Sequence, residues 1–175
     1  MPESGIEIRK LGADDANRFW QLRLEGLELD PEAFTESVEE HRRITVDEIA
    51  RRLSGTVAHG NFVLGAFAAN QLVGMAGFFQ RQGPKVRHRG VIWGVYVQRE
   101  WRGQGVGQRL LSEIVRLART IPGLEQIQLA VGTDRPAARA LYASLGFTTY
   151  GRDPHALKIG DSYVDEEMML LRLKD

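Results

Sequence analysis

Cysteine is absent from this 175-residue sequence. Its absence excludes a disulfide framework, cysteine-bound zinc, iron–sulfur clusters and a cysteine nucleophile. Net charge is absent too, because 23 Lys and Arg residues balance 23 Asp and Glu residues, and a neutral chain lacks the overall charge that favours non-specific binding to nucleic acid. No apolar run approaches the ~20 residues of a membrane-spanning helix, and no secretion signal opens the sequence. We therefore expect a cytoplasmic protein with no nucleic-acid or membrane partner.

The composition is that of an ordinary globular domain, with 43% apolar and 26% charged residues. A chain of this length fits one domain, and no repeat, low-complexity stretch or Pro/Gly/Ser-rich linker divides it. We therefore predict a single domain over residues 1–175. The four histidines are scattered without the spacing of metal ligands, so we expect no metal.

Hydrophobic periodicity predicts alternating strands and helices. From the N-terminus we expect a strand at 6–11, helices at 13–29 and 45–53, an irregular crossover at 31–43, and strands at 61–69, 72–81 and 86–97. A helix at 105–120, a strand at 126–131, a helix at 134–145, a strand at 147–150 and a hairpin at 156–173 complete the series. Tight turns are expected at Asn70-Gln71 and Gly160-Asp161. The order β-α-α-β-β-β-α-β-α-β-β predicts an α/β fold in which helices flank a central sheet. The sheet is expected to be mixed, with parallel and antiparallel strands, as in α+β proteins.

The stretch richest in chemical information runs from Arg102 to Gly107 and reads Arg-Gly-Gln-Gly-Val-Gly. It joins a predicted strand to a strongly amphipathic helix. Glycines let the backbone N–H groups turn toward a ligand, and the start of a helix adds unpaired N–H donors and a positive dipole end. These features favour binding of phosphate or pyrophosphate, to which Arg102 could add a charge-assisted hydrogen bond. The spacing fits neither a Walker A motif nor a Rossmann fingerprint.

Two motifs together resemble the GNAT superfamily of acetyl-CoA-dependent N-acetyltransferases. The first, at residues 95–107, is a strand followed by the superfamily's R/Q-x-x-G-x-G/A pattern. The second, at residues 138–147, is A-x-x-L-Y-x-x-x-G-F. Their order and their separation of ~30 residues are far more specific than either motif alone. The resemblance covers most of the chain and implies the same fold that the order of elements predicts.

The resemblance implies roles for particular residues. The backbone amides that would wrap the CoA pyrophosphate belong to Arg102, Gly103, Gln104, Gly105, Val106, Gly107 and Gln108. The backbone groups that would meet the pantetheine arm and the acetyl carbonyl belong to Val95, Tyr96 and Val97. Tyr142 would lie near the CoA sulfur as a general acid. Acetyl-CoA is the implied cosubstrate, and no metal takes part.

Two further positions need interpretation. Gly94 interrupts an apolar strand, which predicts a bulge, and the superfamily also has a bulge in this strand. Arg135 lies seven residues before Tyr142, where the superfamily often has an asparagine that contacts CoA. Because arginine accepts no hydrogen bond, that contact is not expected here. Arg135 could instead meet a phosphate or face solvent, and of these two alternatives we favour solvent.

The sequence leaves open which group takes the proton from the amine. An alkylamine has a pKa of about 10.4 and is almost entirely protonated at pH 7, so a base or desolvation is needed. Many relatives carry a glutamate in the strand before the glycine loop, but residues 91–95 contain none. His88, Asp165, Glu28 and a water chain are the alternatives. Phe34 is a candidate for the wall of an acceptor pocket.

The predicted function is transfer of the acetyl group of acetyl-CoA to a primary amine, by direct attack in a ternary complex. The acceptor would be a small molecule or a peptide, and a homodimer is compatible with the resemblance. Two alternatives stay open. A non-catalytic acyl-CoA-binding regulatory module would bind CoA without turnover, and an unrelated nucleotide-binding domain would bind ATP or NAD more tightly than CoA.

Overall fold

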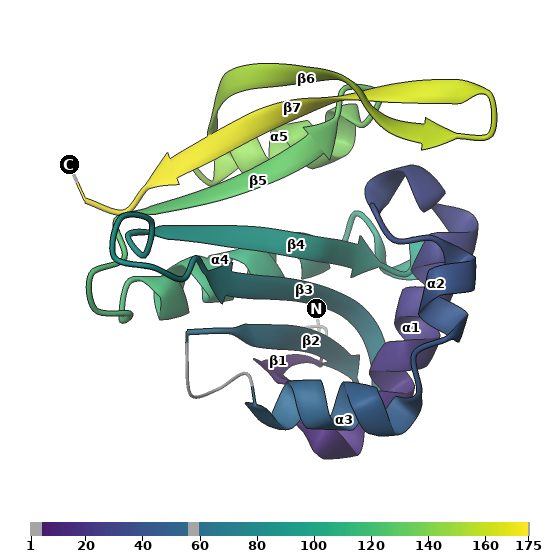
Figure 1. The fold of residues 1–175 in the computed structure, drawn as a ribbon. Helices are drawn as coiled ribbons and strands as arrows, with labels where there is room; N and C mark the ends of the chain where they lie inside the picture. The colour runs from purple at the N-terminus through teal and green to yellow at the C-terminus, as the bar shows by residue number, and fades with distance from the viewer. Residues whose placement is uncertain (1–4, 56–59, 175) are drawn as a thin grey trace.

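The computed structural model describes residues 5–55 and 60–174, in which strands and helices alternate (Figure 1). The strands are β1 (Ile6–Lys10), β2 (Phe62–Ala68), β3 (Gln71–Gln80), β4 (Arg89–Val97), β5 (Gln126–Gly132), β6 (Thr148–Ile159) and β7 (Ser162–Arg172). The helices are α1 (Ala16–Leu29), α2 (Val38–Arg42), α3 (Val46–Gly55), α4 (Val106–Ala118) and α5 (Pro136–Ser144). Two 3-10 turns border the site, η2 (Pro31–Ala33) and η4 (Arg99–Trp101). The helices described here fall short of the length and the apolar character that a membrane-spanning helix requires.

The strands form one mixed sheet in the order β1-β2-β3-β4-β5-β7-β6. Neighbouring strands are antiparallel except for β4 and β5, which run parallel. The parallel pair follows from the connection through α4, because parallel neighbours need a crossover. The predicted mixed sheet with flanking helices is therefore confirmed.

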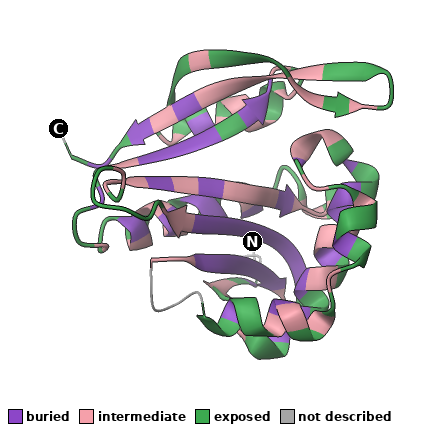
Figure 2. Cartoon of the chain, in the orientation of Figure 1, coloured by how far each residue is buried: buried purple, intermediate pink, exposed green. Residues whose placement is uncertain are grey.

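Helices cover both faces of the sheet, and the alternation of side chains along a strand decides which face each residue serves. On β2, Leu64 packs in the cluster formed with α4 and α5, whereas its neighbour Val63 packs in the cluster formed with α1 and α3. Leu110 on α4 and Phe19 on α1 are buried in these two clusters. Figure 2 shows that β2 and β3 are buried along most of their length, whereas β6 is largely exposed and β7 is mostly intermediate.

The crossover predicted at residues 31–43 is not entirely irregular, because it contains the short helix α2. Ser37 and Glu40 cap its start reciprocally. The Ser37 hydroxyl accepts from the Glu40 N–H at 3.1 Å, and Glu40 Oε2 accepts from the Ser37 N–H at 2.8 Å. The spacing Ser-x-x-Glu is the signal in the sequence that could have predicted this helix.

Three strand boundaries also differ from the prediction. The strand predicted from residue 86 begins at Arg89, since residues 84–88 form a turn. The strand predicted at 147–150 continues to Ile159 as β6, which accommodates its length through two register shifts against β7. The β2–β3 turn lies at Ala69-Asn70, one residue earlier than predicted, with Ala69 at a φ of +51°. The turn at Gly160-Asp161 is confirmed.

Strand β4 positions the candidate site, and its two edges differ. On one edge it pairs with β3 as far as Val97. On the other edge it pairs with β5 over three residue pairs, the last of which is Val91–Gln128, and the two strands diverge beyond that pair (Figure 1). The predicted bulge is confirmed, because the β3–β4 register shifts beside Gly94 and this glycine has a φ of +61°.

Candidate active site

The glycine loop follows η4 and leads into α4. Gly103 and Gly105 have φ values of +73° and +78°, which residues with a Cβ rarely adopt. A Cβ at either position would meet no described atom within 4 Å, so the space beside them is open. The backbone amides from Gly103 to Gln108 donate to no acceptor among the described residues. The loop therefore presents unpaired N–H donors to open space at the positive end of α4, an environment that suits a phosphate group.

The two sequence motifs meet where α4 begins. A Cβ on Gly107 would lie 3.2 Å from Cδ2 of Leu141, so the absence of a side chain at Gly107 lets α4 and α5 approach closely. Val106 and Tyr142 are both buried in the hydrophobic cluster on this face of the sheet. The structure thus brings the two motifs together at Gly107 and Leu141, although β5 separates them in the sequence.

Tyr142 is buried on α5, with 6% of its surface exposed. Its ring packs edge-on against Phe147, with ring centroids 6.1 Å apart, and its hydroxyl makes no hydrogen bond to a described residue. Burial raises the pKa of Tyr142 to about 12, although the positive charge of Arg135 opposes the shift. Because such a phenol stays protonated at neutral pH, it can donate a proton there but not accept one.

Contacts on both sides of β4 fix the three residues that the resemblance assigns to the cosubstrate. Tyr96 points toward α1, where its hydroxyl donates to Glu25 Oε1 at 2.9 Å. Burial and this carboxylate together raise the pKa of Tyr96. The Val97 carbonyl accepts from Nε of Arg102 at 2.8 Å, and Val95 packs against the cluster that contains α4. The Tyr96 side chain therefore anchors β4 to α1, and the backbone is the part of this segment left to meet a ligand.

The Asp30 carboxylate forms ion pairs with three arginines beside the glycine loop. Its Oδ2 accepts from Nη2 of Arg102 at 2.5 Å, and its Oδ1 lies 3.4 Å from Nη2 of Arg99 and 3.6 Å from Nη2 of Arg135. Burial by itself would favour the protonated acid, but the arginines outweigh it and lower the pKa of Asp30. Glu32 also contacts Arg135, at 3.2 Å. The prediction that Arg135 faces solvent is wrong, because these two carboxylates hold it and leave 24% of its side chain exposed.

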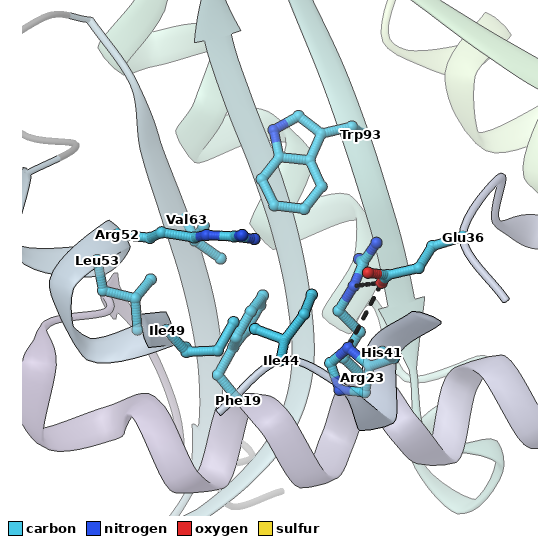
Figure 3. Close-up of a pocket in the computed structure, with 10 residues that line it drawn as sticks. All are labelled: Phe19, Arg23, Glu36, His41, Ile44, Ile49, Arg52, Leu53, Val63 and Trp93. Atoms are coloured by element: carbon cyan, nitrogen blue, oxygen red, sulfur yellow. Dashed lines mark hydrogen bonds and ion pairs between the residues drawn. The ribbon is translucent and has the colours of Figure 1, made fainter. Parts of the chain in front are cut away.

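A cavity of about 370 Å³ lies between helices α1 to α3 and the sheet (Figure 3). Its walls are mostly apolar and are formed by Phe19, Ile44, Ile49, Leu53, Val63 and Trp93. Arg23, Glu36, His41 and Arg52 supply its polar groups. A Cβ on Gly94 would lie 3.0 Å from Nη1 of Arg23, so the cavity borders the β4 bulge.

Arg23, Glu36 and His41 form one connected group at the cavity wall. Nε of Arg23 donates to Glu36 Oε2 at 2.8 Å, and Nδ1 of His41 lies 3.4 Å from the same oxygen. Nε2 of His41 lies 2.9 Å from the carbonyl oxygen of Trp20. A carbonyl oxygen only accepts, so this contact assigns a proton to Nε2. Arg23 thus holds the Glu36 carboxylate in place where it lines the cavity.

The side chains that the sequence offers as bases lie outside the lining of this cavity. Glu28 and Asp165 each pair with an arginine, at 2.8 and 2.6 Å, and His88 lies in the turn before β4, at the end of the strand away from the bulge. Sequence reasoning misses Glu36 because it lies in a polar segment without periodicity. It also misses Arg23, although a charged residue midway between the apolar residues 19 and 27 of one helix face is a readable signal. Within residues 5–55 and 60–174, no three metal-ligating side chains come together.

A second cavity, of about 590 Å³, opens between the η2–α2 segment and the β6–β7 turn. Phe34 and Glu36 line one side of it, and Leu157 and Ile159 line the other. Because Glu36 lines both cavities, the two adjoin at this residue. That Phe34 belongs to an acceptor pocket stays a prediction, and the structure places this side chain at the wall of the second cavity.

Both the sequence and the fold resemble those of known proteins. The profile of the Acetyltransferase (GNAT) family matches residues 23–147. N-alpha-acetyltransferase RimI of Mycobacterium tuberculosis is 37% identical over 91 residues, which are 52% of this chain and 54% of the relative. The match therefore spans about half the length of this curated relative.

Solved structures match over nearly the whole chain. The acetyltransferase of GNAT family from Streptococcus pneumoniae has a TM-score of 0.86 at 24% identity, over 95% of this chain and 98% of that chain. The structure of yncA from Salmonella typhimurium, solved with its cofactor acetyl-CoA, has a TM-score of 0.84 at 21% identity, over 97% of this chain and 95% of that chain. At these identities the likeness concerns the fold.

Proposed function

Because the chain belongs to the GNAT acetyltransferase family, we propose that it transfers the acetyl group of acetyl-CoA to a primary amine. The amine attacks the thioester directly in a ternary complex, and the acceptor is a small molecule or a peptide. The observation that carries this proposal is the close approach of the glycine loop to α5, the helix that carries Tyr142, at Gly107 and Leu141. A phosphate-binding loop and a buried proton donor then belong to one site.

In this proposal the glycine loop binds the CoA pyrophosphate through the backbone amides from Gly103 to Gln108. The Arg102 amide, which the resemblance adds to this set, already donates to the Arg99 carbonyl at 3.2 Å. The open space beside Gly103 and Gly105 and the unpaired N–H groups fit such a ligand. The three arginines that pair with Asp30 and Glu32 carry one more charge than these two carboxylates. The cluster therefore has a net charge of +1 beside the loop, which favours binding of an anion. The Arg102 guanidinium is already bound to Asp30, so we assign the phosphate contacts to the amides. The β4 backbone beyond its last pair with β5 would meet the pantetheine arm.

Acetyl-CoA supplies the activated acetyl group, and residues of this chain move the protons. Glu36 attracts the ammonium form of the acceptor and takes its proton, directly or through water. Backbone N–H groups at the Gly94 bulge stabilise negative charge that develops on the carbonyl oxygen. Tyr142, which its raised pKa keeps protonated, donates a proton to the leaving sulfur.

Thiol release from acetyl-CoA tests the proposal, and a chain without cysteine adds no thiol background. The acceptor panel consists of polyamines, amino acids, aminoglycosides and short peptides, and we expect one class to drive release. Gly105→Ala should weaken acetyl-CoA binding about five- to thirtyfold, because the free variant loop relaxes from the left-handed φ and restoring it on binding costs a residue with a Cβ roughly 1–2 kcal/mol. Gly151→Ala is the matched control, since Gly151 has open space around it and no positive φ.

The other outcomes favour the alternative functions. Binding of acetyl-CoA without release by any acceptor would support a regulatory acyl-CoA-binding module. Tighter binding of ATP or NAD than of CoA would support an unrelated nucleotide-binding domain. Equal affinities of the Gly105→Ala and Gly151→Ala variants would remove the glycine loop from the site.

A further inference from the structure

The cavity beside the Gly94 bulge contains a guanidinium that a pocket for a simple alkylamine does not need. The Arg23 side chain is 14% exposed. Its Cζ lies over the rings of Phe34 and Trp93, 5.3 Å from each centroid. Together with the hydrogen bond to Glu36, these contacts hold the guanidinium in one orientation at the cavity wall.

This guanidinium has unused hydrogen-bond donors. Only Nε of Arg23 donates to another described residue, and Nη1 is buried without a partner. Nη1 lies at the bulge, because it is the atom that a Cβ on Gly94 would approach, and Nη2 is the second nitrogen that donates to no described residue. A buried donor without an acceptor costs free energy, and a ligand that brings an acceptor to this place would remove that cost.

The charges at the cavity are complementary to a zwitterion. Arg23 and Glu36 lie side by side on one wall, so a guanidinium and a carboxylate face the same space (Figure 3). Arg52 reaches in from α3 and pairs with Glu48. A ligand with adjacent positive and negative groups would find a partner for each, and the guanidinium–carboxylate hydrogen bond is among the stronger kinds. The apolar walls leave room for an apolar side chain.

We propose that this cavity binds an α-amino acid with an apolar side chain, whose carboxylate is bound by Arg23 and whose amine accepts the acetyl group. The inference names the substrate class of the proposed acetyl transfer and therefore rests on that function. In the reaction, a C–N bond forms and the thioester C–S bond breaks. The ammonium loses two protons, one of which ends on the CoA sulfur while the other passes through Glu36 to solvent.

The first experiment compares leucine, leucinamide and 3-methylbutylamine as acceptors in the thiol-release assay. They share one apolar side chain, but only leucine carries a carboxylate. We expect kcat/KM for leucine to be at least about tenfold higher, as a charge-assisted hydrogen bond would give. The amide has the more acidic ammonium and so the larger neutral fraction, which means that a preference for leucine has to come from binding. Equal use of leucinamide or 3-methylbutylamine would overturn the inference.

The second experiment measures binding without turnover, by calorimetry with 4-methylpentanoate and 4-methylpentanamide. These probes lack the amine and differ in the carboxylate alone. Preferential binding of the acid supports the carboxylate site even if no acceptor releases thiol, so failure of the acetyl transfer and failure of the site are distinguishable. Equal or undetectable binding of both probes, in a protein that acetylates amines, would overturn the site and leave the transfer standing.

Variants of Arg23 identify the residue responsible. Arg23→Gln should reduce the leucine-to-leucinamide ratio of kcat/KM to about one, and Arg23→Lys should restore part of the ratio because it keeps the charge. If Arg23 only supports the structure or the position of Glu36, Arg23→Gln would lower kcat/KM for both substrates alike and leave their ratio unchanged. An unchanged ratio would therefore overturn the assignment. Arg116→Gln is the matched control, since Arg116 also pairs with a carboxylate, Glu113, on the exposed face of α4.

Discussion

Replacing Tyr142 by phenylalanine should separate catalysis from folding. The ring is buried against Phe147, and the substitution keeps it. The hydroxyl has no hydrogen-bond partner among the described residues, so its removal should change the free energy of unfolding by less than about 1 kcal/mol. Tyr142→Ala, which removes the ring as well, should cost about 3–5 kcal/mol. Urea unfolding of the two variants measures this difference.

The effect of Tyr142→Phe on kcat should be much larger than its effect on stability. General acid catalysis accelerates a reaction roughly 10²- to 10⁴-fold. A thiolate leaves without full protonation, so it gains only part of this acceleration, and we expect Tyr142→Phe to lower kcat at least about tenfold. The dissociation constant of acetyl-CoA should stay unchanged, because the proposed phosphate contacts come from the glycine loop. Tyr163→Phe, on an exposed tyrosine, is the control for loss of a phenol. A kcat within twofold of the wild-type value would remove Tyr142 from the mechanism.

The raised pKa of Tyr142 gives this prediction a pH dependence. With a pKa of about 12, the phenol stays protonated at pH 10, where an ordinary tyrosine is half ionised. The proton donor should therefore persist, and kcat should show no loss with an apparent pKa near 10. Because the pKa is higher in the folded state, the contribution to stability is complete below about pH 10 and is lost as the pH rises through the folded value. A tyrosine-like loss of kcat near pH 10 would refute the reasoning.

Two further substitutions test the surroundings of the site. Asp30→Asn should lower the free energy of unfolding at pH 7 by about 1–2 kcal/mol. The expected loss is this small because the arginines that pair with Asp30 are partly exposed and solvent weakens the ion pairs. Because the pKa of Asp30 is lowered, the loss should be complete above about pH 4 and should shrink as the pH falls through the folded value, which urea unfolding at pH 7 and pH 3 measures. Gly77→Ala would place a Cβ 2.1 Å from Cε2 of Trp93 and should cost about 1–3 kcal/mol. It should raise the acceptor KM more than the acetyl-CoA Kd, and equal effects on both would contradict this.

The parts of the fold that the sequence predicts are those set by local chemistry. The glycine loop, α4 and the Gly94 bulge depend on backbone conformation and on helical periodicity, which neighbouring residues determine. The close approach of the two motifs is predictable for another reason, because two motifs in a fixed order are far more specific than one.

The features that the sequence does not predict depend on contacts between segments distant in the sequence. Arg135 is held by Asp30 and Glu32, about a hundred positions earlier in the chain, and no local pattern reports such a partner. Glu36 and Arg23 come together at the cavity wall only because α1 and the segment before α2 cross the same face of the sheet. The β6 and β4 boundaries depend on pairing with neighbouring strands, which overrides local propensity.

The short parallel pairing of β4 with β5 has a mechanical consequence. Within the sheet, three residue pairs join the half made of β1–β4 to the half made of β5–β7. The glycine loop follows one half, and Tyr142 lies on α5, which follows β5 in the other half. A cosubstrate that touches both halves would add a connection across this short pairing, so we expect the amides around Val91 and Gln128 to exchange their hydrogens more slowly with acetyl-CoA bound than without it.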